Sequence, residues 1–197
     1  MEYKELIQVA DPEITKRKFE AELGKFKAVE EKYWKKGIIC TKIAYPNIYF
    51  IFASPKLIPY PIAFSVRINF TNYDFEPPSV VFINPFTYEP VKREQIPIAF
   101  IQINPNNPLQ VQDLLQGVGE VVPFFCIPGV KEYHDHPAHS GDSWFLYRTK
   151  GEGELLFIID QLYNHSIAIT TSNFLINITV PTVRIQQEIK VQGINLK

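Results

Sequence analysis

The sequence lacks any long hydrophobic run. Apolar segments such as IYFIFA and PIAFSV are short and are interrupted by proline or charged residues, whereas a helix that crosses a bilayer needs about 20 consecutive apolar residues. The first residues, MEYKELIQVADPE, carry acids early and lack the basic-then-apolar layout of a signal peptide. We therefore expect no membrane segment and a cytoplasmic location.

The sequence also lacks an excess of basic residues. The formal net charge is -1, the pI is near 6.4, and no cluster of Lys and Arg is longer than KYWKK. A protein that binds nucleic acid usually carries a broad basic surface. We therefore expect no nucleic-acid partner.

Cysteine and histidine are scarce, with two and four residues respectively. Two cysteines so far apart form no disulfide framework, and in a reducing compartment both are free thiols. Cys40 lies in an apolar stretch and is predicted to belong to the core. Cys126 and three of the four histidines fall in one stretch, CIPGVKEYHDHPAHSGDSW, residues 126–144. This stretch is the candidate site.

What the sequence does contain is enough apolar material for one sizeable core: 46% of its 197 residues are hydrophobic and 21% are charged. Asp11 followed by Pro12 is typical of a helix start. After it, apolar residues recur at mostly three- to five-residue steps, at Ile14, Phe19, Leu23, Phe26, Val29 and Tyr33. The spacing predicts an amphipathic helix of about 20 residues that ends near Gly37.

Four segments rich in β-branched and aromatic residues follow this helix, at residues 38–44, 47–53, 61–70 and 79–83. Short turns separate them, which predicts a four-stranded antiparallel meander and an α+β fold. Residues 84–123 are rich in proline and are predicted to form a long connection with one strand, near 98–105, and a helical turn or two within 109–119.

A second helix is predicted around Leu155, Ile158, Ile159 and Leu162, after a break at Gly151 and Gly153. The alternating pattern of the last residues predicts a β-rich extension, residues 167–197, packed on the domain formed by residues 1–166.

This order of elements resembles the fold of ubiquitin-conjugating enzymes, in which a helix and a four-stranded sheet precede the active cysteine and a further helix. The segment YDFEPPSVVFINP, residues 73–85, resembles the family's paired-proline stretch, and Pro77-Pro78 is its strongest motif. Cys126 stands where the family's cysteine stands in order. The resemblance covers roughly residues 12–166. The family's His-Pro-Asn tripeptide is absent before Cys126, where the sequence reads LLQGVGEVVPFF.

The resemblance implies a carrier enzyme. Cys126 would accept a ubiquitin-like modifier from its activating enzyme as a thioester and pass it to an amine, with no cofactor. The stretch 126–144 also resembles a bacterial family described as metal-binding through a Cys, a Glu and two His residues, whose genes neighbour those of ubiquitin-like proteins, activating enzymes and JAB-type peptidases. Both resemblances imply a bacterial ubiquitin-like modification system.

The residues of the stretch suit nucleophilic chemistry. A thiolate is the reactive form of cysteine, and neighbouring basic groups raise its fraction. We expect Cys126 to be the nucleophile, with Glu132, His134 and His136 as proton-transfer groups and His139 as a further group that could tune the thiol. Asp142 is expected to orient a histidine, and Trp144 to shield the loop.

The same stretch allows a metal alternative. Zinc binds thiolate, imidazole and carboxylate groups, and the available ligands are Cys126, Glu132, His134, His136 and His139. On an extended strand, residues 132, 134 and 136 would point the same way. A zinc-bound Cys126 would no longer be a free nucleophile, so the two interpretations compete.

Two other interpretations stay open. PGVKEYHDHPAHSGDSWFLYRTKGEGEL resembles the first motif of cupins, which would imply a cupin-like metal enzyme. The stretch can also be a polar loop whose histidines only hydrogen-bond the backbone.

Overall fold

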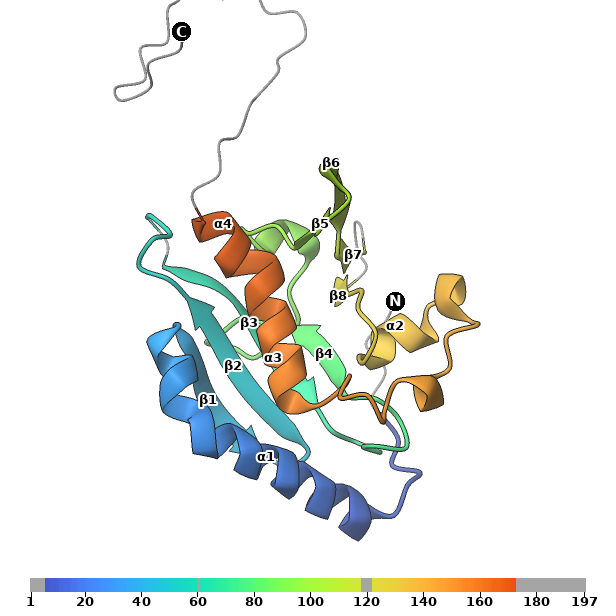
Figure 1. Cartoon of the computed structure of the whole chain (residues 1–197). Helices are drawn as coiled ribbons and strands as arrows, with labels where there is room; N and C mark the ends of the chain where they lie inside the picture. Colours follow the sequence, from blue (N-terminus) through green and yellow to red (C-terminus); the bar gives the residue numbers. More distant parts are fainter. Residues whose placement is uncertain (1–5, 60, 118–121, 173–197) are drawn as a thin grey trace, which may run out of the picture.

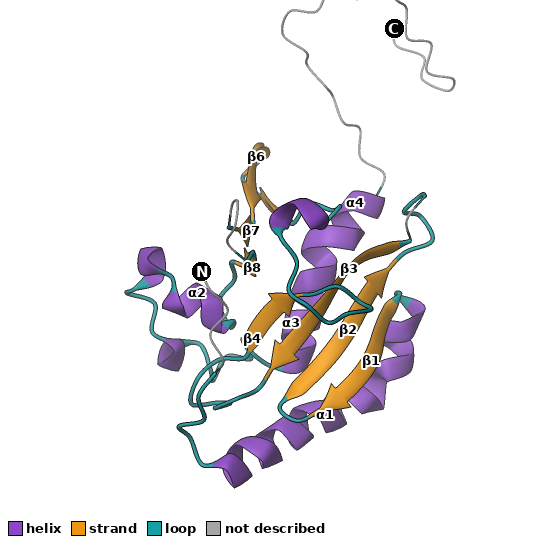
Figure 2. Cartoon of the chain, turned by 180° about the vertical axis from the view of Figure 1, so that it is seen from behind, coloured by secondary structure: helices purple, strands orange, loops and turns teal. Residues whose placement is uncertain are grey.

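The structure is a computed structural model that describes residues 6–59, 61–117 and 122–172. It has the predicted α+β architecture: an N-terminal helix, a four-stranded antiparallel sheet and a helix near the end of the described chain. Both long helices lie on the same face of the sheet (Figures 1 and 2). The two β-hairpin segments and the short helices that follow them lie beyond the β4 edge of the sheet.

Helix α1, Pro12–Lys35, begins at the predicted residue because the Asp11 side chain accepts hydrogen bonds from the backbone N–H groups of Glu13 and Ile14. Phe19, Phe26 and Tyr33 form the buried stripe. Ile14, which the pattern assigned to this stripe, is exposed because Thr15 occupies the buried face in the first turn of the helix.

The sheet has the strand order β1-β2-β3-β4, and every neighbouring pair is antiparallel. The predicted meander is therefore confirmed. Residues alternate between buried and half-buried along β2, which is typical of a strand with one face on the core. The strands are β1 Ile38–Ala44, β2 Asn47–Ala53, β3 Ile62–Asn69 and β4 Ser79–Phe82.

The connection after β4 contains more β-structure than the sequence predicted. It holds η1 (Arg93–Gln95), a hairpin of β5 (Ile101–Asn104) and β6 (Asn107–Asp113), and a short pair of β7 (Leu115–Gln116) and β8 (Phe124–Phe125). The prediction of a helical turn within 109–119 is wrong for residues 109–117, the part of this range that the structure describes. Strand pairing with β5 satisfies the backbone of this segment instead of a local helix.

The last described elements are α3 (Leu155–Tyr163), a π-helical turn η4 (Asn164–Ala168) and the short α4 (Ile169–Thr171). The predicted helix is confirmed, and its four named apolar residues are all buried. The β-rich extension was expected to start at residue 167, but residues 167–171 are helical because they continue α3. Its remaining part, residues 173–197, lies outside the described residues.

Aromatic side chains connect the two helices, the sheet and the candidate site in one core. Phe26 of α1 meets Phe50 edge to face at 5.2 Å between ring centroids. At the other end, Phe100 contacts both Phe82 of β4 and Phe125 of β8, at 5.2 and 5.6 Å. Phe125 directly precedes Cys126, so packing of the core fixes the backbone at the candidate nucleophile.

Among the described residues, no helix combines the length and the apolar character that crossing a bilayer requires.

Candidate functional site

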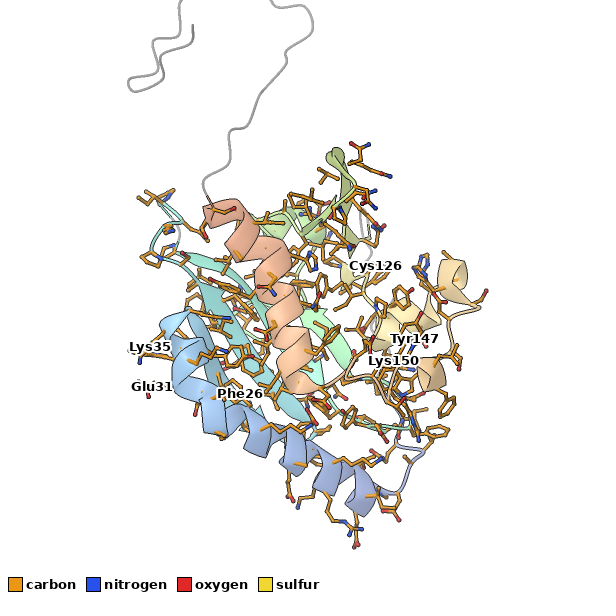
Figure 3. All side chains as sticks on the ribbon, viewed as in Figure 1. Phe26, Glu31, Lys35, Cys126, Tyr147 and Lys150 are labelled. Atoms are coloured by element: carbon orange, nitrogen blue, oxygen red, sulfur yellow. The ribbon has the colours of Figure 1, made fainter. Side chains whose placement is uncertain are left out.

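Cys126 directly follows β8 and packs against the edge of the hydrophobic core. Its backbone N–H donates to the carbonyl of Leu114 at 2.7 Å, and the residues on either side, Phe125 and Ile127, are buried. Cys126 itself is half-buried, and Figure 3 shows it on the side of the chain opposite the labelled residues of α1. Burial raises the pKa of its thiol. A base is therefore needed to generate the thiolate at neutral pH.

The second cysteine has a different setting. Cys40 lies on β1, is half-buried, and packs against the hydrophobic core, as predicted. Burial raises its pKa as well. It is the natural internal control for Cys126.

Residues 131–135 form a short helix, α2 (Lys131–Asp135), instead of the extended strand that the metal interpretation assumed. The backbone N–H of Lys131 donates to the carbonyl of Pro78 at 2.9 Å. The paired-proline segment therefore serves as the anchor of α2. Because successive helical residues point about 100° apart, residues 132, 134 and 136 cannot face one metal ion as they would on a strand.

Glu132 belongs to this anchor. Its carboxylate accepts hydrogen bonds from the Ser79 hydroxyl and from the backbone N–H of Val80, the latter at 3.1 Å. Burial raises the pKa of Glu132. Both carboxylate oxygens of Glu132 bind β4. No contact with the thiol supports the proton-transfer role that was expected for this residue.

The side chains of His134 and His136 form hydrogen bonds with backbone groups. The Nδ1 atom of His134 lies 2.7 Å from the carbonyl oxygen of Asp142, and its Nε2 atom accepts from the N–H of Gly129 at 3.3 Å. A neutral imidazole has one donor and one acceptor nitrogen, so both of them are occupied. His136 accepts from the N–H of Ala138 at 3.2 Å, and its ring lies beside Phe124. The polar-loop interpretation describes these two histidines.

His139, at the end of η2 (Pro137–His139), is the histidine that meets the thiol. Its Nε2 atom lies 3.5 Å from Cys126 Sγ. Its Nδ1 atom lies 3.7 Å from Asp142 Oδ2, which is longer than a hydrogen bond. That Asp142 orients a histidine therefore stays a prediction. The sequence had named His139 together with His134 and His136 as a possible helper of the thiol, and also as a possible metal ligand, without choosing among the three.

Tyr133 of α2 supports both partners of the thiol. Its ring stacks on the imidazole of His139, with 3.9 Å between centroids and 21° between planes. Its hydroxyl donates to Asp142 Oδ2 at 2.7 Å. Burial and this carboxylate raise the pKa of Tyr133. Sequence reasoning missed Tyr133, because nothing in its spacing distinguishes it from other aromatic residues.

Trp144, in η3 (Trp144–Leu146), closes the loop against the start of α3. It is buried, and its indole N–H donates to the carbonyl of Asp74 at 2.9 Å. Gly153 has φ +83°, and a Cβ added there would lie 2.5 Å from Trp144 Cη2. Trp144 therefore packs directly against the backbone of Gly153, and a role in shielding the loop stays a prediction.

The five expected metal ligands are not brought together. Among the residues that the structure describes, which include all five, no three His, Cys, Asp or Glu side chains are grouped so that they could hold one metal ion. Glu132 and His134 are occupied as described above. What the fold assembles is a cysteine, a histidine and a carboxylate in a row, an arrangement that supports nucleophilic catalysis.

Two surface pockets, of about 420 and 590 Å³, lie elsewhere. One is lined by β3 and the segment after β4, and the other reaches Ile169 of α4. Neither is lined by Cys126 or His139. The half-buried thiol and the imidazole beside it therefore lie outside both pockets.

Comparison with known proteins gives a family but no activity. A protein of Sinorhizobium fredii (strain NBRC 101917 / NGR234), named "Uncharacterized protein y4jH", is 38% identical over 174 residues, which is 81% of this chain and 85% of that protein. The model of the Y4jH family matches residues 10–169. This match includes α1, the whole sheet, Cys126, His139 and Asp142. The chain belongs to the Y4jH family.

Proposed function

We propose that this protein is a cysteine-dependent acyltransferase that carries its acyl group as a thioester on Cys126. The observation that carries the proposal is the contact between Cys126 Sγ and His139 Nε2, with Asp142 on the far side of the imidazole. A nucleophile, a base and a group that orients the base are the three parts that covalent acyl transfer requires.

The reaction has two balanced steps. In the first, Cys126 Sγ attacks the carbonyl carbon of a thioester donor, His139 Nε2 takes the thiol proton, and the donor thiolate leaves and takes that proton. In the second, an amine attacks the Cys126 thioester, and its proton passes through His139 to the departing Cys126 sulfur. Asp142 favours the imidazolium that exists between these transfers.

The resemblance to ubiquitin-conjugating enzymes supports a protein modifier as the acyl group. The α+β architecture, the anchoring of α2 to Pro78, and the cysteine between the sheet and α3 agree with that resemblance. The modifier and its activating enzyme are accordingly the proposed partners. The His-Pro-Asn tripeptide of that family is absent before Cys126. In this proposal His139 is the base beside the thiol.

The test uses a short peptide thioester as the donor and intact mass as the readout. Wild-type protein is expected to gain the mass of the peptide acyl group, and dithiothreitol is expected to remove it. Cys126→Ala should abolish the adduct, whereas Cys40→Ala should retain it. An adduct that forms equally on Cys40, or none on the folded wild type, would contradict the proposal.

A further inference from the structure

We infer that this site also hydrolyses its own thioester, so that the protein is a thioesterase toward acyl groups on Cys126 when no amine is bound. The inference rests on the proposed function, because the substrate of hydrolysis is the Cys126 acyl-enzyme. The substrates are acyl thioesters, and the product is the free carboxylic acid.

The first observation is the position of the base. His139 Nε2 is 3.5 Å from Cys126 Sγ, so after acylation it faces the carbonyl carbon that is bonded to that sulfur. A base at this distance can take a proton from any small nucleophile that approaches the carbonyl. Water is such a nucleophile and needs no binding site of its own.

The second observation is the access of water to the base. The side chains of His139 and Asp142 are 26% and 41% exposed, and the loop lies outside both surface pockets. Enzymes that protect a reactive acyl intermediate exclude water by closing over it. On the described surface of this loop, the imidazole that contacts the thiol remains open to solvent.

The third observation concerns the amine that would compete with water. A lysine amine is protonated at neutral pH, and a free carboxylate near the thioester would attract it. The stretch 126–144 contains three acids, and each already has a partner: Glu132 accepts from Ser79, Asp135 pairs with Lys131, and Asp142 accepts from Tyr133. An incoming ammonium group would therefore have to compete with an existing partner at each carboxylate, whereas water needs no carboxylate.

The hydrolytic step balances without a further reactant. A water molecule gives one proton to His139 Nε2 while its oxygen attacks the thioester carbonyl. The C–S bond then breaks, the acid leaves, and the proton on Nε2 passes to Cys126 Sγ, which regenerates the thiol. Asp142 favours the transient imidazolium, as in the acylation step.

The experiment follows the acyl-enzyme formed from the peptide thioester, after rapid removal of excess donor and in amine-free buffer. Decay of the adduct is measured by intact mass, and the released peptide acid is analysed after reaction in ¹⁸O-labelled water. We expect wild-type protein to return to the free thiol and the acid to carry one ¹⁸O atom. His139→Asn should prolong the lifetime of the adduct by about 100-fold, and Asp142→Asn should prolong it by less.

Ser140→Ala is the matched control, because Ser140 is exposed and lies between His139 and Asp142 in the same loop; its decay should equal that of wild type. An adduct that forms normally but decays equally slowly in wild type and His139→Asn would refute hydrolysis and leave the acyl-carrier proposal intact. Failure of the wild-type protein to form any adduct on Cys126 would refute both, whereas slower loading of His139→Asn is expected and is overcome by longer incubation with the donor. Circular dichroism of each variant checks that loss of decay does not reflect loss of folding.

Discussion

At the scale of single residues, Tyr133 joins the two partners of the thiol into one unit. Its ring packs flat on His139, and its hydroxyl bonds Asp142. The contact with the ring limits the rotation of the imidazole, and the hydrogen bond selects the position of the carboxylate. Tyr133 is therefore a positioning residue, which acts on the thiol through His139.

Tyr133→Phe should separate these two contributions, because phenylalanine keeps the stacking surface and removes the hydroxyl. We expect the alkylation of Cys126 by iodoacetamide to slow roughly tenfold, the size of effect of one lost hydrogen bond to a charged group. Its pH profile should move to higher pH, because a less well positioned His139 assists the formation of the Cys126 thiolate less.

The control for that experiment is Tyr147→Phe, since the ring of Tyr147 contacts His134 and the change likewise removes one phenolic hydroxyl from this loop. A purely structural role for Tyr133 would lower the melting temperature and leave the pH profile in place. That result would count against the positioning role.

At the scale of elements, α2 is held to β4 by a buried carboxylate. Glu132 accepts from Ser79 and Val80, and burial raises its pKa. A group with a raised pKa in the folded state stabilises that state fully below its unfolded pKa. This contribution is lost as the pH rises through the folded pKa.

Glu132→Gln should therefore remove a pH dependence of stability. Relative to this variant, the free energy of unfolding of wild type should fall as the pH rises above about 4.3, the ordinary pKa of glutamate. Urea denaturation between about pH 4 and about pH 8 measures the difference. Glu94→Gln, which removes an exposed carboxylate from η1, controls for the loss of one surface charge. A wild-type advantage that grows with pH would show that the carboxylate is stabilised when ionised, against this expectation.

At the scale of the whole molecule, the site depends on segments that meet only in the folded chain. The aromatic core leads from α1 through the sheet to Phe125, and Trp144 closes the loop against the backbone before α3. The position of His139 relative to Cys126 therefore depends on two attachments, β8 at one end of the loop and Trp144 at the other.

Gly153→Ala should loosen the second attachment. The added Cβ would lie 2.5 Å from Trp144 Cη2 and 3.2 Å from the carbonyl oxygen of Gly129, so the ring must shift, at a cost of about 1–3 kcal/mol beyond the backbone strain. Gly151→Ala is the matched control, because Gly151 also has a positive φ but has nothing within 4 Å of its added Cβ. Thermal unfolding should show a larger loss of stability for Gly153→Ala than for Gly151→Ala. Equal losses of stability would mean that the Trp144 contact is unimportant.

The sequence by itself determined the framework. Asp11-Pro12 and the apolar spacing marked α1, the β-branched runs marked the four strands of the meander, and Leu155 to Leu162 marked α3. These signals are local, because capping and periodic burial depend on residues a few positions apart. The order of these elements also placed Cys126 after the sheet and before α3.

Only the tertiary structure decided which side chains meet the thiol. The HDH segment reads equally well as strand or loop, and α2 forms there because Pro78, Ser79 and Val80 supply its anchor from β4. Likewise, β6 is a strand because β5 pairs with it. Of three nearby histidines, His139 is the one that contacts Cys126, because stacking on Tyr133 and the turn through Pro137 place it there. Contacts between distant segments carry no periodic signal in a single sequence, which is why the framework could be predicted and the partner of Cys126 could not.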